Sequence, residues 1–142
     1  MIEVKDLMTT DLHTLRDSDC ISKARDMMAK QHIRHIPILN QDDQFVGILT
    51  QRDVLASTVS ALAEIDASEQ SEIEQAIPIA NVMISDVSAV DEHTGLREVA
   101  EYLLDHKYGC LPVLSDGYLV GIITETDFMK LVIHLLERLE EE

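Results

Sequence analysis

Two stretches decide the fold of this chain: Val46-Gly47-Ile48-Leu49-Thr50-Gln51-Arg52-Asp53 and, 74 residues later, Val120-Gly121-Ile122-Ile123-Thr124-Glu125-Thr126-Asp127. Upstream, Ile36-Pro37-Ile38-Leu39 returns as Leu111-Pro112-Val113-Leu114 at an offset of 75. The one-residue change of offset falls in a hydrophilic turn, where length changes are tolerated. The chain is therefore a tandem duplication of one fold unit, and its function is to be sought in the pair.

Each copy reads as a short helix, a strand, an amphipathic helix, two strands and a final helix. Ser18 or Asp19 in the first copy, and Thr94 in the second, are predicted to cap the amphipathic helix. The next strand is predicted to run from Ile36 to Leu39 or from Leu111 to Leu114, with Pro37 or Pro112 near its start, where a proline is tolerated. Asp116-Gly117 predicts a tight hairpin turn.

The copies define three predicted segments: residues 1–56 as the first repeat, 57–78 as a helix end with an acidic linker, and 79–142 as the second repeat with a C-terminal helix. A helix is predicted from about Asp53 to about Ile65, and a last helix from Asp127 to about Leu139. Each copy is too short to bury a large core alone, so we expect the copies to pack on each other. The last helix carries a broad apolar stripe that predicts a homodimer: Phe128, Leu131, Val132, Leu135, Leu136 and Leu139.

The formal net charge of −16, from 27 acidic and 11 basic residues, opposes binding to polynucleotides and to anionic membranes. No apolar run approaches the ~18 residues of a membrane span. Because Met1 to Asp6 lack the features of a secretion signal, the cytoplasm is the expected compartment. Cys20 and Cys110 occupy unequivalent positions and are expected to be reduced thiols.

The sharpest local motif is Thr-x-x-Asp at the end of each duplicated stretch. Thr50 with Asp53, and Thr124 with Asp127, have the spacing of a helix capping box, and capping alone would explain them. A functional interpretation is also open, because a helix start offers backbone N–H groups to a phosphate and a carboxylate can accept both hydrogen bonds of a ribose diol.

From Val4 to about Met129 the chain resembles a tandem pair of cystathionine-β-synthase-type (CBS) domains, which are regulatory modules that bind adenine nucleotides. The resemblance rests on an ordered series of elements, most of them repeated downstream: Asp6 to Met8, Thr14-Leu15, Ile33-x-x-Ile36-Pro37-Ile38, and Val46 to Asp53. Stand-alone CBS pairs of this size resemble the acetoin-utilisation type of CBS protein.

The resemblance implies a mixed α/β fold of the α+β type, in which two β-α-β-β-α repeats pack around a pseudo-twofold axis and leave two clefts between them. It implies that Asp53 and Asp127 hold ribose and that Thr50 and Thr124 lie near phosphate or ribose. The main chain around Ile36 and Pro37, and around Leu111 and Pro112, would hold the base. Thr14, which often touches the ligand in this family, is matched by Ala89 in the second copy.

Basic residues distinguish the copies. Arg34-His35 precede the apolar-Pro pair in the first copy, where the second has Gly109-Cys110, and Arg52 corresponds to Thr126. The resemblance implies contact of at least one of these basic residues with phosphate, and we therefore expect one dominant site. The alternative is that Arg34 is a surface ion-pair partner and His35 an ordinary half-buried imidazole.

We therefore expect a non-enzymatic sensor of an adenosine-containing small molecule, with AMP, ADP or ATP as ligand, no required cofactor, and an unidentified protein effector. S-adenosylmethionine or a dinucleotide is the alternative ligand. A structural dimerisation module with empty clefts is the alternative function. No catalytic constellation stands out, and His32-x-x-His35 lacks an evident third ligand, so neither catalysis nor a metal site is predicted.

Overall fold

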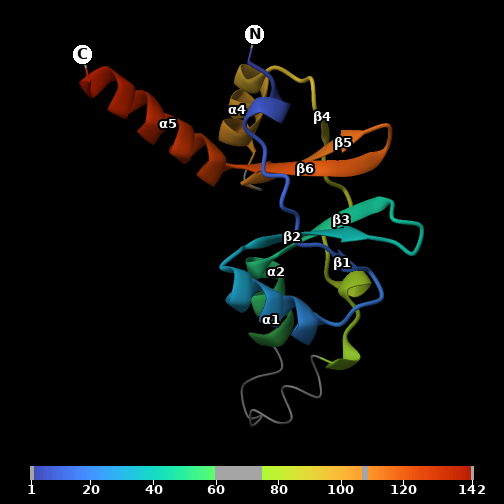
Figure 1. The fold of residues 1–142 in the computed structure, drawn as a ribbon. Helices are drawn as coiled ribbons and strands as arrows, with labels where there is room; N and C mark the ends of the chain where they lie inside the picture. Colours follow the sequence, from blue (N-terminus) through green and yellow to red (C-terminus); the bar gives the residue numbers. More distant parts are fainter. Residues whose placement is uncertain (1, 60–74, 107–108, 142) are drawn as a thin grey trace. The chain divides into compact units, whose positions relative to one another are not determined.

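The computed structural model describes residues 2–59, 75–106 and 109–141, which form two compact units (Figure 1). One unit is His13–Val87, and the other joins Met1–Leu12 to Ser88–Glu142. This division differs from the division into sequence repeats, because the opening segment of each repeat belongs to the unit that holds the strands and helices of the other repeat.

The unit His13–Val87 is built on one three-stranded sheet. Strand β2 (His35–Leu39) lies in the middle, parallel to β1 (Leu15–Arg16) and antiparallel to β3 (Phe45–Thr50). Helices α1 (Ile21–Gln31) and α2 (Gln51–Val59) pack together beside this sheet, and the 3-10 turn η2 (Ile79–Asn81) completes the unit (Figure 1).

The second unit repeats this plan. Strand β5 (Cys110–Ser115) lies between the parallel β4 (Val90–Asp91) and the antiparallel β6 (Tyr118–Thr124). Its helices are α4 (Leu96–Asp105) and α5 (Glu125–Glu140), and its 3-10 turn is η1 (Val4–Asp6). The predicted fold class and the β-α-β-β-α order of each repeat are therefore confirmed.

Turn chemistry follows the sequence closely in the second unit. Asp116 and Gly117 have φ angles of 52° and 84°, and Ser115 pairs with Tyr118, so the predicted two-residue hairpin forms with the left-handed backbone that Asp-Gly favours. The helix predicted from Asp53 begins earlier, at Gln51, and its predicted end near Ile65 lies outside the described residues, as does most of the acidic linker.

The opening segments complete cores that belong, in sequence, to the other repeat. Val4 is buried among Leu96, Val99 and Ile123, and Ile79 is buried in the core that contains Ile21, Ile36 and Leu49. These segments also bring backbone carbonyl groups to the starts of two helices. The Leu96 N–H donates to the Ile2 carbonyl over 2.9 Å, and the Ile21 N–H donates to the Ile77 carbonyl over 3.1 Å.

This arrangement corrects the predicted helix caps. The N-cap residues are Cys20 and Gly95, not Ser18, Asp19 or Thr94, and neither makes a side-chain capping hydrogen bond. The physical reason is that a first-turn N–H of each helix already has a backbone acceptor from a distant segment. The Asp19 carboxylate instead accepts a hydrogen bond from the Arg16 N–H over 2.7 Å.

The prolines also differ from expectation, because each lies at the third residue of a central strand. Pro37 pairs in register with Ile48, and Pro112 with Ile122. Both backbone groups of Ile48 bond to Ile84, and both of Ile122 bond to Thr9. The partner strand therefore requires no N–H from either proline, so the usual cost of proline inside a sheet is avoided.

The last helix carries its apolar stripe over two environments. Phe128 and Leu131 pack against the core of their own unit, whereas Val132, Ile133, Leu135, Leu136 and Leu139 are 44–67% exposed. In Figure 1 the later turns of α5 project away from the rest of this unit. No helix among the described residues is both long and apolar enough to cross a membrane.

Candidate functional site

Several predicted site residues of the first copy meet where β2 begins and β3 ends. His35 pairs in register with Thr50, Ile36 with Leu49, and Pro37 with Ile48. The Gln51 N–H donates to the Arg34 carbonyl over 2.9 Å, which ties the start of α2 to the start of β2. Thr50 and Asp53 therefore lie beside His35 and the Arg34 backbone.

Asp53 is held at the start of α2 by Thr50. The Thr50 hydroxyl and N–H both donate to Asp53 Oδ2, over 2.7 and 3.0 Å, and the Asp53 N–H donates back to the Thr50 hydroxyl over 3.1 Å. This reciprocal pattern is the predicted capping box. It uses one carboxylate oxygen and leaves Asp53 Oδ1 without a hydrogen bond from any described residue.

Asp127 is the corresponding residue of the second copy, and it is more fully engaged. The Thr124 N–H donates to Asp127 Oδ2 over 2.9 Å within a capping box, and the Thr9 hydroxyl donates to Asp127 Oδ1 over 2.9 Å. The residue is 6% exposed, whereas Asp53 is half-buried. The family resemblance gives both carboxylates the same ribose-binding role, whereas the structure gives them different hydrogen-bond partners.

The remaining predicted residues fall into buried and exposed groups. Ile36, Pro37, Leu111 and Pro112 are buried in the two central strands, while the side chains of Arg34, Arg52, Ala89 and Thr126 are exposed and Thr14 is half-buried just before β1. Within the described part of the chain, no hydrogen bond or ion pair joins the side chain of Thr14, Arg34 or Arg52 to Thr50 or Asp53.

Cys110 occupies the place of His35, since it pairs in register with Thr124. Burial raises the pKa of its thiol to about 12, so this thiol stays protonated and contributes no charge to the site. The neighbouring Gly109 carbonyl accepts a hydrogen bond from the Glu125 N–H over 3.2 Å, which repeats the Arg34 to Gln51 contact. The backbone frame is thus the same in both copies, and the side chains differ.

The hydrogen bond from Thr9 to Asp127 was not predicted from the sequence. The signal was present in the repeat, because Met8-Thr9 corresponds to Met83-Ile84 at the offset of 75. However, the alignment of the copies cannot reveal that the opening segment of the first repeat lies against β6, next to the carboxylate of the second repeat.

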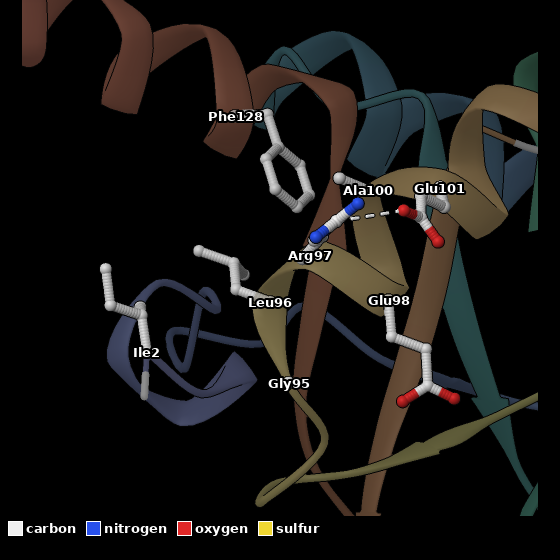
Figure 2. Close-up of a pocket in the computed structure, with 8 residues that line it drawn as sticks. All are labelled: Ile2, Gly95, Leu96, Arg97, Glu98, Ala100, Glu101 and Phe128. Carbon is white, nitrogen blue, oxygen red and sulfur yellow. Dashed lines mark hydrogen bonds and ion pairs between the residues drawn. The ribbon is translucent and has the colours of Figure 1, made fainter.

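The unit that contains Asp127 also has an apolar hollow. As Figure 2 shows, the Phe128 ring and Leu96 line it, with Ile2 nearby and the Arg97–Glu101 ion pair at its edge. None of its lining residues is a predicted site residue. In the described ranges, no group of three or more His, Cys, Asp or Glu side chains is placed to hold a metal ion.

Comparison with known proteins identifies the repeat. Residues 4–59 and 79–134 each match the profile of the CBS domain. A solved structure of a protein from Vibrio cholerae assigned to acetoin utilization (AcuB) is 41% identical, covers 100% of this chain and 98% of its own, and superposes with a TM-score of 0.81.

Two more distant structures share the fold and contain ligands. CBSX2 from Arabidopsis thaliana, solved in complex with AMP, is 23% identical over 95% of this chain and 98% of its own, with a TM-score of 0.79. MJ0100, solved with 5′-methylthioadenosine and S-adenosylmethionine, is 24% identical over 93% of this chain and 96% of its own CBS pair, with a TM-score of 0.75. Against two curated sequence relatives, the chain spans only 42% and 61% of their lengths.

Proposed function

The chain belongs to the CBS-domain family, and on that premise we propose that it is a non-enzymatic regulatory module that binds an adenosine-containing nucleotide, with AMP, ADP or ATP as the ligand. The observation that carries this proposal is the half-buried Asp53 carboxylate, which Thr50 fixes at a helix start through one oxygen only. A carboxylate fixed in this way is preorganised to accept hydrogen bonds from a ribose diol.

The surroundings of Asp53 favour a phosphorylated ligand. Arg34 and Arg52 are exposed on the same unit, and His35 lies beside Thr50 in the sheet. In a chain with a net charge of −16, an anionic ligand needs such local cations. The proposal therefore includes contact of at least one of these basic side chains with phosphate. Regulation would arise because the ligand stabilises those arrangements of the chain to which it binds best, and an unidentified partner protein would read the change.

Binding is tested by a thermal-shift screen with adenosine, AMP, ADP, ATP and S-adenosylmethionine, followed by calorimetric titration of the best ligand. A ligand that binds only the folded state raises the midpoint, and at about 100 times its Kd it adds about 2.7 kcal/mol to the free energy of unfolding. If none of these compounds shifts the midpoint or titrates, the alternative of a purely structural module, in which the capping boxes only start helices, is favoured instead.

We further propose that the exposed face of α5 packs against a second copy of the chain. Six apolar side chains of this helix are at least 44% exposed, and single helices of this length are marginally stable in water unless an apolar face is covered. In an antiparallel pair, Lys130 of one copy comes beside the acidic end of the other, which contains Glu137 and Glu140. The hollow at Phe128 adjoins this face and would receive apolar side chains of the second copy.

Light scattering at tens of micromolar tests the dimer. The expected mass is twice 16.0 kDa for the wild type and 16.0 kDa for Leu136→Glu, which places a charge in the apolar face. Leu104→Glu is the matched control, since Leu104 is an exposed leucine on α4, and it should remain dimeric. A wild-type mass of one chain contradicts the proposal.

A further inference from the structure

Thr9 and Ile84 occupy the same position in the two units. The Thr9 N–H and carbonyl bond to Ile122 over 2.8 and 3.0 Å, and those of Ile84 bond to Ile48 over 2.8 and 2.9 Å. Gly121 and Gly47 allow this close approach, because a Cβ atom on either would meet Met8 or Ile84 within 2.7 Å. Each segment is therefore fixed beside the strand that ends in Thr-x-x-Asp.

The two residues differ in one functional group. Thr9 has a hydroxyl, which donates to Asp127 Oδ1 over 2.9 Å, whereas Ile84 has none to offer Asp53. No fully buried side-chain oxygen or nitrogen of the described residues lacks a hydrogen-bond partner. Asp53 Oδ1, which receives no hydrogen bond from those residues, is therefore in contact with solvent and open to a ligand.

We propose that the residue at the Thr9/Ile84 position selects which carboxylate binds the ligand: Thr9 engages Asp127 for the fold, and Ile84 leaves Asp53 as the ribose acceptor of the dominant site. This inference rests on the proposed nucleotide binding and adds to it the assignment of the site and the residue that determines it. Thr9 acts through Asp127 and is a specificity-determining residue, not a ligand contact.

The physical basis is competition between two hydroxyl donors for one carboxylate oxygen. The Thr9 hydroxyl is held in place by the backbone, so it bonds to Asp127 without the loss of translational freedom that a free ligand incurs. A ribose hydroxyl that displaces it exchanges one hydrogen bond for another and gains little. At Asp53 the same ribose hydroxyl replaces only water, and the hydrogen bond to a charged acceptor increases affinity by about tenfold or more.

Reciprocal substitutions test this assignment. Thr9→Val removes the hydroxyl while keeping a β-branched side chain, and its control, Thr9→Ser, keeps the hydroxyl. Ile84→Thr introduces a hydroxyl beside Asp53, and its control, Ile84→Val, does not. Each variant is titrated calorimetrically with AMP and ATP, after circular dichroism has established that it is folded.

We expect Ile84→Thr to weaken the dominant site by about tenfold relative to Ile84→Val, and Thr9→Val to strengthen a second site by about tenfold relative to Thr9→Ser. The assignment is overturned if either member of a pair binds like its control, or if Thr9→Val loses affinity, which would make Thr9 a ligand contact. If the wild type binds neither nucleotide, the proposed function itself fails; binding by the wild type with no response to the substitutions refutes only this inference.

Discussion

The two Thr-x-x-Asp helix starts have the same backbone frame and different side-chain environments. In each unit a distant segment forms two backbone hydrogen bonds with the returning strand. The carbonyl three residues before the central proline accepts a hydrogen bond from the N–H of the first residue of the following helix. The residues around the frame are Arg34, His35, Arg52 and Ile84 in one unit, and Gly109, Cys110, Thr126 and Thr9 in the other.

This difference indicates how a duplicated fold acquires unequal sites. Backbone hydrogen bonds do not depend on side-chain identity except at glycine and proline, so the frame persists while the surrounding side chains diverge. One unit retains exposed cations and a carboxylate oxygen open to solvent. The other retains a buried thiol and a carboxylate bonded at both oxygens.

The largest expected contrast is in cysteine reactivity. Burial raises the pKa of Cys110 to about 12, while a hydrogen bond from Ser22 lowers the pKa of the half-buried Cys20 below 9.0. At pH 8 the thiolate fraction of Cys110 is then far smaller than that of Cys20. Iodoacetamide should alkylate Cys20 in the native protein, and mass spectrometry of Cys20→Ser should find no label. Labelling of both thiols in urea is the control; rapid native labelling of Cys110 would contradict the expectation.

The next contrast is between the two glycines. A Cβ on Gly47 would lie 2.7 Å from the Ile84 carbonyl, which is backbone, whereas on Gly121 it would lie 2.5 Å from the flexible end of Met8. Gly47→Ala should therefore lower the free energy of unfolding by about 2–3 kcal/mol, and Gly121→Ala by about 1 kcal/mol or less. Urea denaturation measures both losses of unfolding free energy. Equal losses would mean that the Ile84 backbone moves aside as easily as the Met8 side chain.

Substitution of the two carboxylates should separate binding from stability. Asp53→Ala is expected to weaken nucleotide binding by about tenfold or more, with a stability loss of only ~1 kcal/mol for the cap. Asp127→Ala should leave the dominant site unchanged and cost about 2 kcal/mol, because it removes a cap and leaves the Thr9 hydroxyl without its acceptor. Titration and urea unfolding of both variants decide this. Equal losses of affinity would argue that the two sites are equivalent.

The smallest contrast concerns phosphate. Arg34→Ala and Arg52→Ala should each reduce the preference for ATP over adenosine by up to about tenfold, since each removes one charge-assisted donor. Arg97→Ala is the control for net charge: it removes an exposed arginine of the other unit, which pairs with Glu101. A preference that is unchanged in the first two variants, or lowered equally in all three, would identify these arginines as surface charge only.

The sequence was sufficient for several elements that depend on local pattern. The apolar runs, the Asp116-Gly117 turn and the Thr-x-x-Asp spacings each predict an element from residues close together in the chain, and the structure contains these elements. The family resemblance extended this to the fold of each repeat. The carboxylates Asp53 and Asp127 were identified because their capping partners, Thr50 and Thr124, lie three residues away.

The errors arise where a distant segment replaces a local partner. Thr94 and Asp19 are sound capping residues, but the Ile2 and Ile77 carbonyls already meet an N–H of each helix. Likewise, Pro37 is acceptable within β2 only because Ile84 takes the hydrogen bonds of Ile48. The inequality of the carboxylates has the same origin, since Thr9 lies 118 residues from Asp127. The two residues of each pair are too far apart in the chain for a local sequence pattern to reveal the contact.

The exchange of opening segments also sets an order for folding during synthesis. The unit His13–Val87 is continuous in sequence, so all of it is available once Val87 has left the ribosome. Val4, by contrast, precedes this unit in the chain, and its core partner Ile123 follows far downstream of it. The segment around Val4 therefore cannot pack in its core until β6 has been made, which is after the unit His13–Val87 is able to fold. The opening segment of the first repeat therefore depends on the second repeat for its packing.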